Sequence, residues 1–262
     1  MRDRSSSMTG PAPMKRTSSA ARLAIPLLAA LLVAGPAPGV RSQPAGSQPA
    51  DLDLGIMHVV VINRSVGRFF RRGTAFHVGG GVFYTNAHVV KDKIPEGYTE
   101  WRLTSPSSGL VPDTWLGPAT ISCIHPLWKD TGDTSLVSPY DVAQLRVDGA
   151  SELPPALSLA NWLPQAGTPV RIKGFPAASR GWPPVLYTST GRVDEMRMAD
   201  QTFFIRIDSG FTLGGSSGSP VLADDNRVIG IVFGGSGAEQ RTASGEGSAV
   251  TVFGIQSGCP AR

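Results

Sequence analysis

The chain has 262 residues, which is long enough to bury a substantial core in one or two domains. Positions 1–45 hold six basic residues and one acidic residue, a net charge of +5, so positions 46–262 carry 4 − 5 = −1 of the formal total of +4. The basic balance therefore belongs to the leader. The remainder lacks the concentrated positive charge of a nucleic-acid-binding domain, and we expect no nucleic-acid partner.

A positively charged and then apolar segment opens the chain. Basic residues within 15–22 precede an apolar run over 23–34, and small residues and prolines follow. This order is typical of a secretory signal peptide, and the run is shorter than the ~20 residues of a membrane span. We expect a signal peptide and leader over 1–45, a linker over 46–55, and a secreted or periplasmic protein without stable membrane association after cleavage. An uncleaved anchor is the alternative.

The rest of the sequence has the pattern of an all-β protein. Short apolar or alternating runs recur between turn residues, with no helical periodicity beyond about two turns. Six runs lie at 57–63, 73–78, 81–86, 101–104, 119–124 and 142–147, and six more at 169–175, 185–193, 202–208, 219–223, 227–234 and 249–255. A Pro-rich segment over 151–167 separates the two groups. The pattern predicts two antiparallel barrels or sandwiches.

A loop rich in glycine and serine, "GGSSGSP" over 214–220, is the first candidate for chemistry. A nucleophilic hydroxyl needs a base to take its proton and N–H donors to stabilise the resulting oxyanion. Glycines let the backbone turn sharply, so the N–H groups of Gly215 and Ser217 can point at one spot. Taken alone, such a loop is more often a flexible turn.

Two further segments supply a base and an acid. His88 lies in "YTNAHVV" after an apolar strand, and Asp141 begins the alternating strand of "SPYDVAQLRV". Taken singly, these residues are more often a packed histidine and a strand-entry aspartate. Asp130 and Asp133 are rival acids, but their polar loop has no apolar strand to fix them. Chymotrypsin-like enzymes place histidine, aspartate and serine in this chain order, whereas subtilisins and α/β-hydrolases use other orders.

These motifs resemble those of the bacterial trypsin/chymotrypsin-like serine peptidases over roughly 55–256. "TNAHVV" is similar to the histidine motif of Deg-type proteases, and "GGSSGSPV" followed by "RVIGIVFGG" is similar to glutamyl endopeptidases. The resemblance implies two six-stranded antiparallel β-barrels with the active site in the cleft between them. It makes Ser217 the nucleophile, His88 the general acid–base, Asp141 the residue orienting His88, and Gly215 and Ser217 the oxyanion-hole donors. No cofactor is implied.

The resemblance also sets domain boundaries and a substrate-binding surface. The peptidase domain would span 56–262, with barrels over about 56–150 and 166–256. Substrate would contact Phe211, Thr212 and the edge strand formed by Val232, Phe233 and Gly234. Val232 stands where glutamyl endopeptidases have a histidine that helps to bind the substrate's acid, so we expect an apolar or small residue before the scissile bond. The substrate backbone would pair with this strand.

The two cysteines, Cys123 and Cys259, are the last candidates. Export permits a disulfide, but the sequence leaves open whether they pair. Two distant cysteines and four scattered histidines make a poor metal site, and we expect no metal. The sequence thus predicts an exported, monomeric serine endopeptidase acting on polypeptides. The alternatives are a catalytically silent relative that serves as a binding module and an esterase-like hydrolase with the same three residues.

Overall fold

The computed structural model describes residues 49–92, 94–106, 115–129, 140–176, 185–236 and 245–261. The chain divides into Met1–Pro44 and Ala45–Arg262, and every described residue belongs to the second unit. The expected signal peptide and the rival acids Asp130 and Asp133 lie outside the described residues. Within the described part, no helix has the length and apolar character required to cross a membrane.

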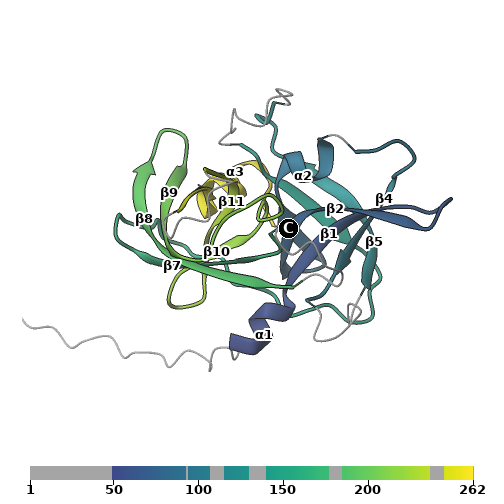
Figure 1. Ribbon diagram of the computed structural model, residues 1–262, viewed down its shortest axis with the longest axis horizontal. Helices are drawn as coiled ribbons and strands as arrows, with labels where there is room; N and C mark the ends of the chain where they lie inside the picture. Colours follow the sequence, from purple (N-terminus) through teal and green to yellow (C-terminus); the bar gives the residue numbers. More distant parts are fainter. Residues whose placement is uncertain are drawn as a thin grey trace, which may run out of the picture. The chain divides into compact units, whose positions relative to one another are not determined.

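The first six strands close into an antiparallel barrel in the order β1-β2-β3-β6-β5-β4 (Figure 1, right). They are β1 (Ile56–Asn63), β2 (Arg68–Gly79), β3 (Val82–Thr85), β4 (Glu100–Thr104), β5 (Trp115–Ile124) and β6 (Ala143–Val147). A one-turn helix, α2 (Ala87–Lys91), follows β3 after a single residue. Inward-facing side chains such as Phe83, Leu103 and Leu145 fill the barrel. Closure leaves no sheet edge along most of the barrel wall.

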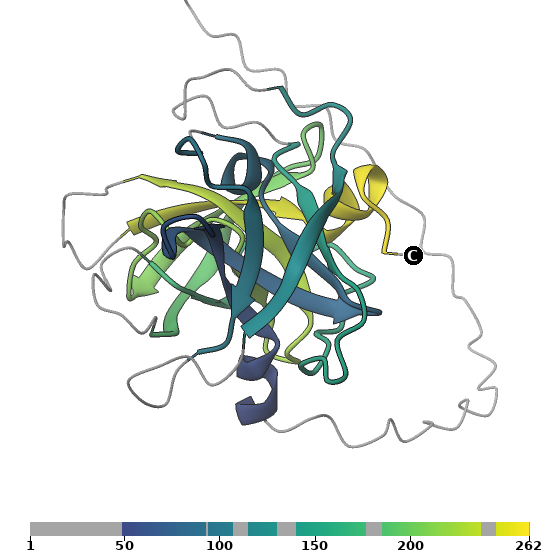
Figure 2. The same ribbon diagram turned by 90° about the vertical axis from the view of Figure 1, so that its right-hand side faces the viewer.

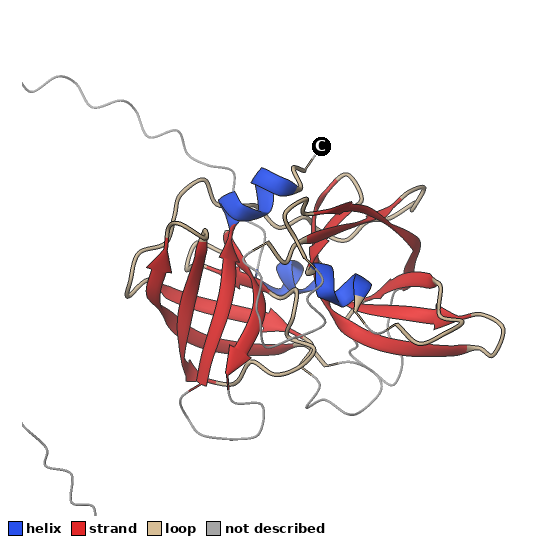
Figure 3. Cartoon of the chain, turned by 90° about the horizontal axis from the view of Figure 1, so that it is seen from above, coloured by secondary structure: helices blue, strands red, loops and turns tan. Residues whose placement is uncertain are grey.

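The second six strands form a second closed antiparallel barrel in the order β10-β11-β12-β9-β8-β7. They are β7 (Pro169–Gly174), β8 (Tyr187–Arg197), β9 (Thr202–Ser209), β10 (Pro220–Leu222), β11 (Val228–Ser236) and β12 (Gly245–Thr251). Figure 3 shows the two groups of strands side by side. The prediction of two six-stranded antiparallel barrels is confirmed.

The barrels share a buried apolar cluster. Phe76 and Tyr84 come from the first barrel, and Leu222 and Ile231 come from the second. Leu157, in the Pro-rich connection, packs with them. Burying a side chain of this size contributes roughly 1.5–3 kcal/mol, so the shared cluster holds the barrels together.

Two helices replace segments expected to be linker or strand. Within the expected linker over 46–55, α1 (Pro49–Leu54) forms, because Leu52 packs into the cluster between the barrels. The strand expected over 249–255 ends at Thr251, and α3 (Val252–Gly258) follows, as Figure 2 shows in yellow. Thr251 caps this helix by accepting a hydrogen bond from the Gly254 N–H at 3.2 Å. Val252 and Ile255, three residues apart, are both buried, which suits a helix.

Candidate active site

The first barrel brings His88 and Asp141 together. β3 pairs with β6 through Thr85 and Ala143, so the segments that continue from these strand ends lie side by side. The main-chain N–H of His88 donates to Asp141 Oδ1 at 2.9 Å, and the ring Nδ1 forms a hydrogen bond with Asp141 Oδ2. The Asn86 side chain donates to the Asp141 carbonyl at 2.6 Å. The carboxylate of Asp141 is thus occupied on both oxygens by His88.

This pairing determines which nitrogen of the His88 imidazole carries a proton. A carboxylate accepts the Nδ1 proton, which leaves Nε2 as the ring nitrogen available to take a proton from elsewhere. The Asp141 side chain is 6% exposed, whereas that of His88 is 27% exposed. Asp141 is therefore buried, whereas solvent can reach the His88 imidazole.

The Ser217 loop of the second barrel joins β9 to β10. Within it, the Ser216 N–H donates to the Leu213 carbonyl at 2.8 Å, and Ser216 Oγ accepts from the Leu213 N–H at 3.2 Å. The Ser219 N–H donates to the Ser216 carbonyl at 3.0 Å. Ser216 therefore has a structural role in a tight turn. The loop is a hydrogen-bonded turn and not a floppy connection.

This loop docks on the first barrel through Thr74 of β2. The Thr74 N–H donates to the Ser217 carbonyl at 2.8 Å, and Thr74 Oγ1 donates to the Gly215 carbonyl at 3.0 Å. Gly218 has φ +87°, and a Cβ there would lie 1.9 Å from the Thr74 carbonyl oxygen. Thr74 in turn accepts from Thr85 Oγ1 at 2.7 Å, at the end of the strand that leads to His88. The contacts place Ser217 on the same side of the first barrel as His88 and Asp141.

Three groups of the loop remain unbonded within the described part of the chain. They are the Ser217 hydroxyl and the N–H groups of Gly215 and Ser217. The Ser217 hydroxyl makes no hydrogen bond with His88, and the Ser217 side chain is partly exposed. Unpaired N–H groups next to a serine are the donors that a developing oxyanion requires. A hydroxyl–imidazole hydrogen bond commonly tightens only when substrate binds.

The structure separates the predicted substrate-binding residues into two sets. Phe211 is 36% exposed and packs on Tyr187, with ring centroids 5.7 Å apart. Its main-chain N–H and carbonyl both bond to Ser189 Oγ, at 3.0 and 2.9 Å. Thr212 is buried and donates to the Glu246 carbonyl at 3.2 Å, and a Cβ at Gly235 would lie 2.6 Å from Thr212 Oγ1. Thr212 thus forms a packed wall, and Phe211 forms part of the surface.

The second set requires a correction, because β11 is not an edge strand at Val232. The Val232 N–H donates to Ser219, and its carbonyl accepts from Gly218, at 2.9 and 2.8 Å. Its side chain is 1% exposed in the core of the second barrel, so neither backbone nor side chain is available to substrate. Phe233 is a bulge residue packed between the barrels. Among the described strands, β11 is paired on the β12 side alone only from Gly234 onward, because β10 pairs no further than Ile231.

His77 and His125 have packing roles. His77 is buried, stacks on Phe83 at 4.8 Å and bonds through Nδ1 to the Pro154 carbonyl at 2.7 Å. His125 is buried and stacks on Tyr140, with ring centroids 4.9 Å apart. Burial lowers the pKa of both rings. Among the described residues, no group of three or more His, Cys, Asp or Glu residues could hold a metal ion.

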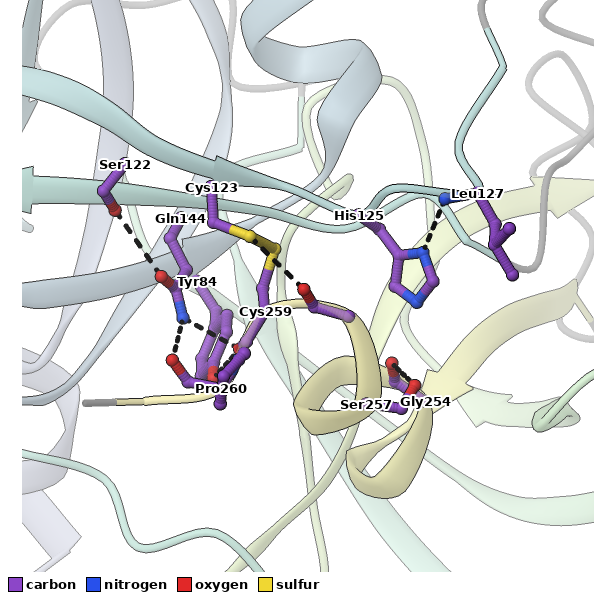
Figure 4. Close-up of a disulfide and its surroundings, with 11 residues drawn as sticks. Tyr84, Ser122, Cys123, His125, Leu127, Gln144, Gly254, Ser257, Cys259 and Pro260 are labelled. Carbon is purple, nitrogen blue, oxygen red and sulfur yellow. Dashed lines mark hydrogen bonds between the residues drawn. A yellow bond between two sulfur atoms is a disulfide. The ribbon is translucent and has the colours of Figure 1, made fainter.

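Cys123 and Cys259 form a disulfide, which the sequence left open (Figure 4). It joins β5 of the first barrel to the residue that follows α3, across a sequence separation of 136. The Cys259 carbonyl accepts from Tyr84 Oη at 2.5 Å and from Gln144 Nε2 at 2.8 Å. Tyr84 and Gln144 are cross-strand partners on β3 and β6. The C-terminal segment is therefore bound to the strand pair β3 and β6, whose ends lead to His88 and Asp141.

Three residues of this site were missed by the sequence analysis: Arg72, Thr74 and Asn86. Thr74 and Asn86 act through side-chain hydrogen bonds to residues 141 and 55 positions away, and no local pattern predicts such contacts. Arg72 binds main-chain carbonyls of α2. Arg72 ends the stretch "RFFRR" over 68–72, and nothing in that stretch distinguishes it from the arginines at 68 and 71.

Comparisons with known proteins agree with this architecture. A sequence profile for the trypsin-like peptidase domain matches residues 73–231. The active form of the Rv3671c protease from M. tuberculosis has a TM-score of 0.54 and 21% identity, covering 88% of this chain and 96% of that chain. The inactive form of its serine-to-alanine mutant has a TM-score of 0.53 and 21% identity, covering 82% and 93%. No curated protein matches significantly.

Two closed six-stranded antiparallel barrels define a protein of the chymotrypsin fold, and the structural matches carry that fold and no more. The profile match spans more than half of the chain. The chain therefore belongs to the trypsin-like peptidase domain family, and its fold is the chymotrypsin fold.

Proposed function

We propose that this protein is an exported serine endopeptidase that cleaves polypeptides through an acyl-enzyme on Ser217. The observation that carries the proposal is the hold of Asp141 on His88, through both the main-chain N–H and the ring Nδ1. A partly exposed imidazole whose Nδ1 is bound by a buried carboxylate is the arrangement of a general base. Export is proposed from the signal-like leader alone.

The reaction follows from the groups available. His88 Nε2 takes the proton of Ser217 Oγ as the oxygen attacks the peptide carbonyl. The N–H groups of Gly215 and Ser217 stabilise the resulting oxyanion. His88 then gives the proton to the leaving amine, and water hydrolyses the ester through the same steps. Asp141 keeps the Nδ1 proton in place and stabilises the imidazolium that forms.

The substrate-binding surface supports a polypeptide as substrate. Beyond Val232, the strand β11 has Gly234 and Gly235, which lack side chains and, within the described part of the chain, pair only with β12. An extended peptide can add to such an open strand through main-chain hydrogen bonds. Packed Thr212 and exposed Phe211 offer no charged group to a substrate side chain, which supports an apolar or small residue before the scissile bond.

Covalent labelling of the full chain with a fluorophosphonate tests the proposal, with the modified peptide identified by mass spectrometry. We expect label on Ser217 in the wild type, no label in Ser217→Ala and strongly reduced label in His88→Ala. Ser219→Ala is the matched control, because the buried Ser219 Oγ has no partner among the described residues and should be dispensable. Label on another residue would contradict the assignment of Ser217.

The second candidate is a catalytically silent binding module. The absence of a hydrogen bond between Ser217 Oγ and any described residue, His88 included, is the observation that favours it. A folded wild-type protein that takes no label and cleaves no unfolded polypeptide would support this alternative.

A further inference from the structure

The helix that carries His88 is too short to hold itself in place. α2 has five residues, Ala87–Lys91, and its N-cap residue Asn86 makes no side-chain capping hydrogen bond. The last four carbonyl groups of any helix lack partners within the helix. In α2 these orphan groups begin with the Val89 carbonyl, next to His88, whose own carbonyl accepts from the Asp92 N–H at 3.0 Å. A helix of a single turn therefore depends on contacts from outside to fix its backbone around His88.

Arg72 on β2 supplies those contacts. Its Nε donates to the Val89 carbonyl at 2.7 Å, and its Nη2 donates to the His88 carbonyl at 3.0 Å and to the Asp92 carbonyl. The guanidinium also lies against the Phe70 ring, 5.6 Å from the centroid. A planar fork of donors with a fixed positive charge suits the carbonyl end of a helix, where the dipole is negative.

His88 is thereby held through both of its main-chain groups. Asp141 Oδ1 accepts from its N–H at 2.9 Å, while Arg72 and the Asp92 N–H, at 3.0 Å, donate to its carbonyl. Rotation of either peptide group at His88 would break one of these bonds. The position of the imidazole then depends only on its side-chain torsions, and the Asp141 carboxylate fixes the ring.

The same stretch of β2 also holds the nucleophile loop. Two residues after Arg72, Thr74 binds the carbonyls of Ser217 and Gly215. Between them, a Cβ on Gly73 would lie 2.8 Å from both the Ser217 carbonyl oxygen and a methyl group of Val89 in α2. Residues 72–74 therefore form a spacer with α2 on one side and the Ser217 loop on the other.

We propose that Arg72 is a positioning residue that sets the distance between the His88 imidazole and the Ser217 hydroxyl by clamping α2 to β2. The proposal rests on the catalytic roles proposed above for His88 and Ser217. Arg72 touches no reacting atom. It acts through the main chain of His88, and its loss lets α2 shift relative to Ser217.

The test compares Arg72→Gln and Arg72→Lys with Arg68→Gln, which removes an exposed arginine of the same strand. In the full chain, kcat, KM and the rate of fluorophosphonate labelling are measured per folded molecule, with thermal unfolding followed in parallel. We expect Arg72→Gln to lower kcat about 10²-fold with KM nearly unchanged, since a misplacement of about 1 Å has that effect. Arg72→Lys should lose about tenfold, because an ammonium lacks the planar fork. Arg68→Gln should match the wild type.

A spectroscopic measurement separates this proposal from the proposed function. In the inactive Ser217→Ala background, the downfield proton resonance of His88 Nδ1–H reports the pairing of His88 with Asp141. We expect it to broaden or shift with Arg72→Gln and to sharpen again when millimolar guanidinium, but not methylammonium, is added. An unchanged resonance would overturn the positioning role. So would a loss of activity in Arg72→Gln and Arg72→Lys that the unfolded fraction fully explains. Absence of label in the wild type would instead refute the proposed function alone.

Discussion

The two barrels have the same strand number and closure, but they present their functional groups in opposite states. In the first barrel, His88 and Asp141 are held by bonds to side chain and main chain. In the second, the hydroxyl of Ser217 and the N–H groups of Gly215 and Ser217 have no partner among the described residues. A base must be aligned before substrate arrives, whereas a nucleophile and oxyanion donors must be free to meet it. The difference shows two forms of preorganisation. The first barrel holds His88 and Asp141 by hydrogen bonds, whereas the second barrel leaves the hydrogen-bonding groups of the Ser217 loop free.

The largest effect should follow from removing the free hydroxyl of the second barrel. We expect Ser217→Ala to lower kcat for a peptide substrate about 10⁶-fold, and His88→Ala to lower it about as much, because the two act as one unit. The free energy of unfolding should stay within about 0.5 kcal/mol for Ser217→Ala, since its hydroxyl bonds to nothing in the described chain. Steady-state kinetics and urea unfolding measure both. A double variant no worse than either single variant would show the coupling.

The next largest effect should come from breaking the hydrogen bond between Asp141 and His88 in the first barrel. Asp141→Asn keeps the shape of the side chain but presents an amide donor to His88 Nδ1, so we expect a loss of about 10⁴ in kcat. Asp148→Asn is the matched control, since Asp148 is exposed and pairs only with exposed Arg146 among the described residues. Full activity in Asp141→Asn would redirect the search for the acid to Asp130 and Asp133.

A third prediction concerns the covalent link between the barrels. The Cys123–Cys259 disulfide closes a loop with a sequence separation of 136, for which the chain-entropy estimate is about 5 kcal/mol. We expect Cys123→Ser with Cys259→Ser to lose up to that much free energy of unfolding and to leave kcat less affected. Urea unfolding with and without reductant measures the loss. The double variant should not respond to reductant, and equal stability of the oxidised wild type and the double variant would contradict the prediction.

The smallest effect is a pH dependence of the free energy of unfolding that arises from a histidine of the first barrel. All four histidines precede the second barrel in the sequence, and burial, with the nearby Arg71 charge, lowers the pKa of His58 from 6.5 to about 3. His58 is therefore protonated below pH 6.5 in the unfolded chain, but only below about pH 3 in the folded chain. Stability should fall with decreasing pH across this window, by about 1.4 kcal/mol per pH unit for this one group.

The measurement compares urea unfolding of the wild type and His58→Leu at pH 7 and pH 5. We expect the wild type to lose about 2 kcal/mol more than the variant over this interval. His77 and His125 remain in both proteins, so their contributions cancel. Parallel losses in the two proteins would show that His58 accepts a proton while folded.

The sequence by itself determined the fold class and the three residues of the proposed site. Period-two alternation and turn residues are local properties, so the strands of both barrels could be predicted, and the motifs around His88, Asp141 and Ser217 stand in short, ordered segments. The helices α1 and α3 could not be predicted, because Leu52 and Ile255 become part of a core only when both barrels are assembled.

Tertiary structure alone decided the pairing of the cysteines, the burial of Val232 and the contacts of Thr74 and Arg72. Each depends on segments far apart in the chain meeting at one place: β5 with the C-terminal segment, β11 with the Ser217 loop, and β2 with α2. Sequence patterns report which face of a strand is apolar. They do not report which main-chain group of a distant segment will accept a hydrogen bond, because closure of the barrels sets that geometry.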